Sequence, residues 1–319
     1  MDELHRSLGL FVDMAVEAHA MLRGDARVEV PGVREQVQER EHCKVVTIDI
    51  LDAEGAARMG RPQGSYITIE APPLKINDPY VREDIIEAIK AVLARMLEGR
   101  LNPQDTVLLV GLGNRHAVAD SLGPRFIEYS PITRHYYRHV PEALVEGMRP
   151  SCGIAPGVLG LTGLESFEVI RGIVDKVKPA LLITVDSLAA QDVRRIGNSI
   201  QICDTGIQPG GGVNNAREAI TQEGLGVPVI AIGCPTIVNA ALIAQQAVKS
   251  FCTDSGVSFD EIRAVNIIRD ILAFYEGGLA VTPKEVDDII KYTAQTIAMG
   301  VGCALFPGIE VEQLEMYSQ

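Results

Sequence analysis

Apolar residues recur along this chain with two spacings, one typical of helices and one of strands. Helical spacing covers residues 3–22, 81–99, 163–177, 259–275 and 283–299. Runs rich in β-branched residues predict strands over 44–51, 65–70, 105–112, 181–188, 199–203 and 227–233. A further helix is predicted from about Pro235 to Ser250. Residues 52–64 and 205–226 carry glycine without a clear period and are expected to be connections.

The order of these segments indicates the fold class. From residue 105 strands and helices alternate, and strands joined by crossover helices are typical of a parallel sheet. We therefore expect an α/β fold with a mostly parallel, twisted sheet flanked by helices. No stretch has the composition of a flexible linker, so a single folded domain is expected.

Composition and charge narrow the class of protein further. The chain has 319 residues, 47% of them apolar, and a net charge of −13, so it lacks the excess of basic residues with which proteins bind nucleic acid. Its six cysteines form no CxxC pair, which is typical of reduced, cytoplasmic proteins. The acidic N-terminus does not resemble a secretion signal, and the longest apolar stretch, 227–244, is interrupted by proline and glycine. We expect a cytoplasmic protein without a membrane span.

The stretch GLGNRHAVADSLGP, residues 111–124, raises the possibility of a nucleotide loop. Gly111 and Gly113 follow a predicted strand, as in a GxGxxG motif, but His116 stands where the third glycine belongs. No GxxxxGK[ST] motif is present. The two glycines are therefore interpreted as a turn after a strand, and a nucleotide-binding or regulatory module is kept only as an alternative.

Two carboxylates follow predicted strands and are candidates for chemistry. Asp120 lies in the loop after strand 105–112, and Asp186 ends the apolar run LLITV. In open α/β sheets, reactive groups gather beyond the carboxyl ends of strands. If the two strands are neighbours, both acids face one cleft, where two close carboxylates would share a proton. Such a pair could activate water and protonate a leaving amine, although each aspartate could instead cap a helix or bond a loop.

Three weaker signals are interpreted structurally. The triplet Asp204-Thr205-Gly206 occurs in pepsin-like proteases, but a single copy in an α/β context is read mainly as a turn. Cys234 precedes a predicted helix, which can activate a thiol, yet no histidine is near it in sequence. His116 is read as an exposed loop residue rather than a substrate ligand.

Taken together, several motifs resemble one known family. The stretches VLLVGLGNRHAVADSLGP, IAPGVLGLTGLES, LITVDSLAA, ICDTGIQPGGGVNNAREAI and GVPVIAIGCPTIVNA are similar to those of the germination proteases of spore-forming bacteria. The resemblance implies an endopeptidase that begins the degradation of small acid-soluble spore proteins, with a fold like that of the hydrogenase-maturation endopeptidases. It also implies that Asp120 and Asp186 are the catalytic aspartates, the two acids that the strand pattern indicates.

The same resemblance implies a zymogen in the spore core. Its propeptide would be residues 1–13, cut between Asp13 and Met14, leaving residues 14–319 as one peptidase domain. A homotetramer without cofactor or metal is expected. A nickel-dependent peptidase of the hydrogenase-maturation type is the alternative function.

The oxyanion of such a reaction needs backbone N–H donors. The glycines at 111–113 and 210–212 could supply them, which makes Gly111, Gly113 and Gly211 candidates for binding the oxyanion or substrate.

Overall fold

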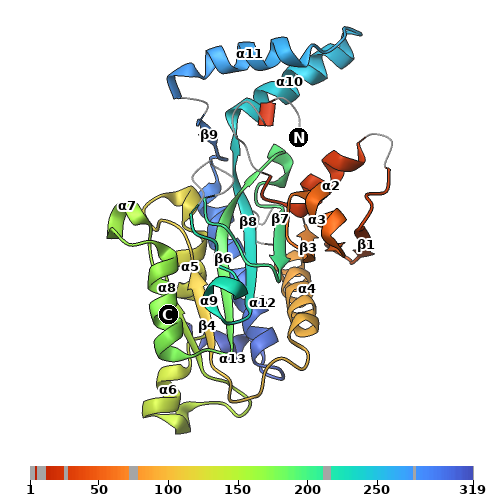
Figure 1. Ribbon diagram of the computed structural model, residues 1–319. Helices are drawn as coiled ribbons and strands as arrows, with labels where there is room; N and C mark the ends of the chain where they lie inside the picture. Colours follow the sequence, from red (N-terminus) through yellow and green to blue (C-terminus); the bar gives the residue numbers. More distant parts are fainter. Residues whose placement is uncertain are drawn as a thin grey trace.

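The computed structural model describes residues 4–5, 12–24, 28–71, 78–210, 217–275 and 278–318. In these residues nine strands form one sheet in the order β1-β2-β3-β7-β8-β6-β4-β5, with β9 also paired to β8 (Figure 1). The strands are β1 Val33–Glu39, β2 Lys44–Ile50, β3 Gly64–Glu70, β4 Val107–Gly111, β5 Ser151–Ile154, β6 Leu181–Ala190, β7 Ser199–Cys203, β8 Val229–Asn239 and β9 Ala280–Val281.

Helices cover both faces of this sheet. The α-helices are α2 Ala15–Arg23, α3 Ala53–Met59, α4 Pro79–Leu97, α5 Leu122–Tyr129, α6 Arg134–His139, α7 Leu159–Thr162, α8 Ser166–Val177, α9 Gln222–Leu225, α10 Ala240–Asp254, α11 Glu261–Ile271, α12 Val286–Leu305 and α13 Val311–Glu315. Short 3-10 turns are η2 Val118–Asp120, η3 Pro141–Ala143, η4 Val193–Arg195 and η6 Ala273–Tyr275. This arrangement confirms the expected α/β fold with a helix-flanked sheet.

Alternate residues of the strands feed different cores, and this places the polar positions. Odd-numbered residues of β4 and β6, such as Leu109 and Ile183, pack in one large cluster with α4, α5 and α12. On the other face two smaller clusters form, one with α8 around Leu182 and one with α2 and α3 around Leu188. Asp186 is an even-numbered residue of β6 and so lies on this second face, where it lines a cavity.

The parallel part of the sheet is smaller than expected. Strands β5, β4, β6 and β8 run parallel, whereas β1, β2, β3, β7 and β9 pair antiparallel with their neighbours. The connection from β1 to β2 is short and allows only a hairpin. The sheet is therefore mixed. The alternation of strands and helices correctly predicts parallel pairing only for β4, β5, β6 and β8.

Four local predictions differ from the structure. The helix expected over 3–22 is interrupted: helical residues occur at 4–5 and in α2, and Met14 is extended, with φ −97° and ψ 129°. Strand β8 continues through Pro235 to Asn239, and its register against β6 shifts beside the proline. The helix α10 starts only at Ala240, where the Asn239 side chain accepts a hydrogen bond from the N–H of Ala241. The expected connections 52–64 and 205–226 contain the short helices α3 and α9.

Two helices near the C-terminus differ in how they pack. Helix α12 is largely buried behind the strands, whereas α10 and α11 extend away from one end of the sheet (Figure 1). The base of the α10–α11 pair is held by an apolar cluster that includes Val238, Leu242 and Val265. Among the described residues no helix combines the length and the apolar character that crossing a membrane requires.

Candidate active site

Strands β4 and β6 are parallel neighbours, as the sequence argument required. Gly111, the last residue of β4, pairs with Val185 of β6, so β6 continues past the end of β4. Asp186 is the first residue beyond that level. The predicted strand 181–188 already continued past Asp186, and β6 extends two residues further, to Ala190. Asp186 nevertheless lies at the edge of a crevice, since its neighbour β4 has already stopped.

Asp120 reaches the same crevice from the loop after β4. It closes the turn η2, and one of its carboxylate oxygens accepts a hydrogen bond from the N–H of Asn114 at 2.9 Å. Gly113 has φ 112°, and a Cβ placed there would lie 2.2 Å from the carbonyl oxygen of Asp120. Thr236 of β8 holds the loop from the other side, because its hydroxyl donates to the carbonyl of Ala119 at 2.6 Å. The loop is thus fixed at both ends.

Burial and mutual repulsion change how these acids ionise. Desolvation raises the pKa of Asp186 well above its usual value, and the charge of Asp120 raises it further, against a lowering hydrogen bond from Ser187 N. Desolvation also raises the pKa of Asp120, against the hydrogen bond from Asn114. Asp186 is only 5% exposed, so it is the acid that water solvates least. Both effects favour a state in which the pair shares one proton and carries one negative charge.

The crevice is an open cavity of about 760 Å³ whose walls include both aspartates. Val12 and Asp13, from the N-terminal segment of the same chain, also line it. Asp13 accepts a hydrogen bond from the N–H of Ala189 at 2.8 Å, and its charge is among the causes that raise the pKa of Asp186. Desolvation raises the pKa of Asp13 itself to about 6, although the Ala189 hydrogen bond and the charge of Arg61 lower it.

The residues on either side of Asp13 are held by side chains of the folded body. The Arg61 guanidinium donates to the carbonyl of Val12. Gln201 of β7 contacts the chain twice: its Nε2 donates to the carbonyl of Asp13 at 3.2 Å, and its Oε1 accepts from the N–H of Ala15 at 2.7 Å. These contacts explain why the expected N-terminal helix breaks at residues 12–14.

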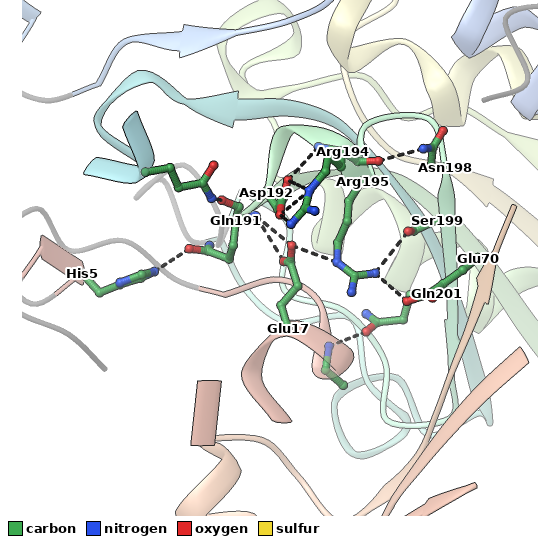
Figure 2. A network of polar contacts seen from close by, with 12 residues as sticks. His5, Glu17, Glu70, Gln191, Asp192, Arg194, Arg195, Asn198, Ser199 and Gln201 are labelled. Atoms are coloured by element: carbon green, nitrogen blue, oxygen red, sulfur yellow. Dashed lines mark hydrogen bonds and ion pairs between the residues drawn. The ribbon is translucent and has the colours of Figure 1, made fainter. Parts of the chain in front are cut away.

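Helix α2, which follows this segment, is anchored by a second polar network (Figure 2). Glu17 accepts hydrogen bonds from the N–H of Gln191 at 3.0 and 3.2 Å, and Arg195 lies 3.4 Å from its carboxylate. Arg195 also donates to Glu70 of β3 at 2.7 Å. Desolvation raises the pKa of Glu17 to about 7, against the lowering effects of Arg195 and of the backbone hydrogen bonds. The network ties the helix to the loop after β6.

The candidate glycines have different positions. Gly113 lines the cavity beside Asp120, whereas Gly111 lies in β4, where a Cβ would lie 2.0 Å from the carbonyl oxygen of Gly123 in α5. Gly111 therefore allows close helix–strand packing, and its role in binding the oxyanion stays a prediction. Gly211 lies outside the described residues.

The weaker signals have structural explanations. Asp204 accepts a hydrogen bond from the N–H of Ser65 at 2.9 Å, which ties the turn after β7 to β3, as the reading of the triplet as a turn expects. Cys234 is inside β8 rather than at a helix start, and desolvation raises its pKa to about 12, so the structural interpretation of this thiol is supported. His116 is exposed, as expected.

Sequence reasoning missed Gln201 and Arg61. Gln201 carried a usable signal, because it is a polar residue in the middle of the apolar strand SIQIC, as Asp186 is in LLITVDSL. Arg61 carried none, since it stands among other polar residues in a connection and reaches the cavity only through the folding of β3 against β7.

Comparison with known families identifies the chain. The family model described as germination protease matches residues 12–267, a span that contains Asp13, Asp120, Asp186 and Gln201. The chain belongs to the germination protease family. This membership makes it a peptidase that acts on protein in germination.

Relatives in this family match nearly the whole chain. A germination protease of Clostridium acetobutylicum is 38% identical over 96% of this chain and 98% of its own length. That of Caldanaerobacter subterraneus is 38% identical over 96% and 97%, and that of Bacillus velezensis 35% identical over 96% of each. Among solved structures, the [NiFe] hydrogenase maturation protease HycI of Thermococcus kodakarensis matches 57% of this germination protease chain and 97% of its own, at 18% identity and a TM-score of 0.28.

Proposed function

We propose that this chain is an aspartate-dependent endopeptidase, made as a zymogen, in which Asp120 and Asp186 hydrolyse peptide bonds. The observation that carries the proposal is the pair of carboxylates with raised pKa values in one cavity, beside a segment of the same chain. Family membership supports peptide hydrolysis but does not by itself identify the acids.

The different environments of the two acids suggest their roles. Asp186 is more deeply buried and keeps the shared proton, whereas Asp120 is the ionised base. Asp120 takes a proton from water as the water oxygen bonds to the scissile carbonyl carbon. Asp186 gives its proton to the nitrogen as the C–N bond breaks. The proton on Asp120 then moves to Asp186, which restores the starting state of the pair.

The first bond cut is proposed to be the chain's own, between Asp13 and Met14. Val12 and Asp13 line the cavity together with the two aspartates, and Met14 has the extended backbone that a peptide substrate would adopt. Residues 1–13 would then be the propeptide and residues 14–319 the peptidase domain. While the segment stays in place, it blocks other substrates.

Substrates and assembly follow from the family resemblance. We propose small acid-soluble spore proteins as the substrates and the spore core as the location. The net charge of −13 fits an enzyme that does not bind DNA itself. A homotetramer is proposed, supported by the apolar side chains exposed on α10 and α11. For the alternative of a nickel-dependent peptidase, no group of three or more His, Cys, Asp or Glu side chains in the described part of the chain is arranged to hold a metal ion, so no observation favours it.

Asparagine variants of the two acids test the proposal. The full-length wild type should lose residues 1–13, as measured by intact mass, and should then degrade a purified small acid-soluble spore protein. We expect Asp120→Asn and Asp186→Asn each to slow both reactions by about 10²- to 10⁴-fold, the usual range for removing an acid or base.

Asp175→Asn, at an exposed position on α8, is the matched control and should react as the wild type does. Undiminished cleavage by both site variants would refute the aspartate mechanism. A wild type that cuts the spore protein but starts at a residue other than Met14 would refute the assigned junction alone.

A further inference from the structure

The sheet places a neutral amide beside the buried acid, at the same level of the strands. Asp186 of β6 pairs with Gly233 of β8, and Gly233 pairs in turn with Gln201 of β7. Paired residues on neighbouring strands point to the same face, so the side chains of Asp186 and Gln201 flank a position that has no side chain of its own. All three residues line the cavity.

The Gln201 side chain is held in place before any substrate arrives. It is 6% exposed, and its neighbours Ile200 and Ile202 are buried in the core on the opposite face. A primary amide carries one acceptor and two donors, and leaving them unpaired in a buried site is costly. In this structure both ends of the amide are satisfied by main-chain groups of residues 13 and 15.

We propose that Gln201 binds and positions the peptide bond to be cut, both in the chain's own N-terminal segment and in protein substrates. This inference rests on the proposed function. The Nε2 group donates to the carbonyl oxygen of the scissile bond itself, and the Oε1 atom accepts from the N–H of the second residue after that bond. The scissile peptide is thereby held between the amide and the aspartate pair in one orientation.

The contact with the carbonyl has a chemical consequence. As water adds to the carbonyl carbon, negative charge develops on the oxygen, and a positioned N–H donor stabilises that charge. A neutral amide suits this place because the cavity already holds Asp13, Asp120 and Asp186, and a further carboxylate would repel the developing charge. Arg61 assists by holding the preceding carbonyl, that of Val12.

A further contact lies where β8 bulges against β6: Leu188 pairs with Pro235 and Ala189 with Ile237, so the extra residue, Thr236, belongs to β8. The register between β6 and β8 shifts at Leu188/Ala189, and the N–H of Ala189 donates to the Asp13 carboxylate. The residue before the scissile bond is thus bound through its side chain by Ala189 and through its carbonyl by Gln201. Both contacts come from strands that flank β8, so they do not depend on a loop closing.

The test combines two substitutions at Gln201 with a change in the substrate. Gln201→Glu keeps the acceptor and removes the amide donor, whereas Gln201→Met keeps the volume and removes both. The substrate is a peptide with the sequence of residues 9–18, together with an analogue in which an ester oxygen replaces the N–H of Ala15. Chains that do not process themselves are first cut by the wild type and repurified.

We expect Gln201→Glu and Gln201→Met to lower kcat by about 10²- to 10³-fold, as removal of an oxyanion donor does elsewhere. For the wild type, the ester should lower kcat/KM by about fivefold to tenfold, the effect of one lost hydrogen bond. For Gln201→Met the ester should have no further effect, because the partner is already gone. If Gln201 had only a structural role, the ester would lower kcat/KM by the same factor in the wild type and in Gln201→Met.

Gln104→Met, at an exposed loop position, is the control, and thermal unfolding confirms that each variant is folded. Wild-type kcat in both Gln201 variants would overturn the inference while leaving the aspartate pair intact. A wild type that cleaves the ester and the amide equally would also overturn it, even if neither variant folds. Full activity of Asp120→Asn and Asp186→Asn would instead overturn the proposed function.

Discussion

At the scale of single residues, the site depends on close approaches that only particular side chains allow. Gly113 lets the loop fold back until the carbonyl of Asp120 occupies the place of a Cβ. Gly233 puts no side chain between Asp186 and Gln201, and a Cβ there would lie 2.6 Å from the side chain of Leu188. The two glycines therefore help to position the acids, because neither Gly113 nor Gly233 has a side chain that would occupy the space beside them.

Gly113→Ala should displace Asp120, because the added methyl group overlaps the Asp120 carbonyl and alanine strains at φ 112°. We expect kcat/KM for the spore protein to fall by about 100-fold, the effect of misplacing a reacting group by roughly 1 Å. Gly172→Ala on α8, where a Cβ meets open space, is the control and should keep full activity. Wild-type kcat/KM in Gly113→Ala would show that this contact does not position the acid.

At the scale of elements, the break before α2 separates the proposed propeptide, residues 1–13, from the peptidase domain that remains after cleavage. Val12 and Asp13 line the cavity, and Met14 is extended. Helix α2 begins directly after Met14 and is anchored through Glu17 to the loop after β6. Helix α2 also packs its residues Ala15 and Val16 into the cluster with β2 and β3. After the cut, these contacts would keep the new N-terminus beside the cavity.

The Glu17 carboxyl should make stability depend on pH. Its folded-state pKa of about 7 lies above the ordinary value of 4.5, so the folded protein binds more protons between these values. Stability from this group is fully present below about pH 4.5 and is lost as pH rises through 7. We expect Glu17→Gln, which cannot ionise, to show a smaller fall in melting temperature from pH 5 to pH 8 than the wild type.

The measurement is thermal unfolding by circular dichroism at fixed ionic strength. Glu83→Gln, at an exposed position on α4, is the control and should follow the wild-type curve. If Glu17→Gln loses as much stability as the wild type over this range, Glu17 is not the group that titrates.

At the scale of the whole molecule, one end of the structure leaves apolar side chains uncovered. Phe251 on α10, Ile271 on α11 and Phe274 in η6 are 69%, 72% and 87% exposed. These helices extend from the end of the sheet (Figure 1), away from the large core that holds α12. Large apolar side chains exposed along one pair of helices favour a surface that binds protein, and a further copy of this chain is the occupant we propose.

The double variant Phe251→Ser with Ile271→Ser should therefore shift the protein to a smaller species, because it removes apolar area from the shared surface. Size-exclusion chromatography with light scattering measures the mass at several concentrations. Leu51→Ser, which changes an exposed apolar residue elsewhere, is the control and should keep the wild-type mass. A wild type with the mass of one chain would contradict the assembly proposal.

The fold was predictable where the pattern is local. The core helix α4 and the strands β6 and β7 lie close to their expected bounds, because each has a long or strongly apolar signal. Strand β1 was missed because six of its seven residues are exposed and carry no apolar alternation. Pro235 misled the prediction of β8, because the pairing with β6 that continues through the proline to Val238 is not visible in the local sequence.

For the site, the sequence alone determined which residue types stand after which strands. That was enough to select Asp120 and Asp186, because an acid that follows an apolar run is unusual wherever the run lies. The tertiary structure decided that β4 ends one residue short of the level of Asp186 and that Gln201 stands level with Asp186 across Gly233. It also decided that Gln201 hydrogen-bonds the main chain of Asp13 and Ala15. The physical reason is that hydrogen-bond pairing between strands decides which residues become neighbours. Pairing joins residues that are far apart along the chain, and the local sequence of neither strand shows which partner it will have.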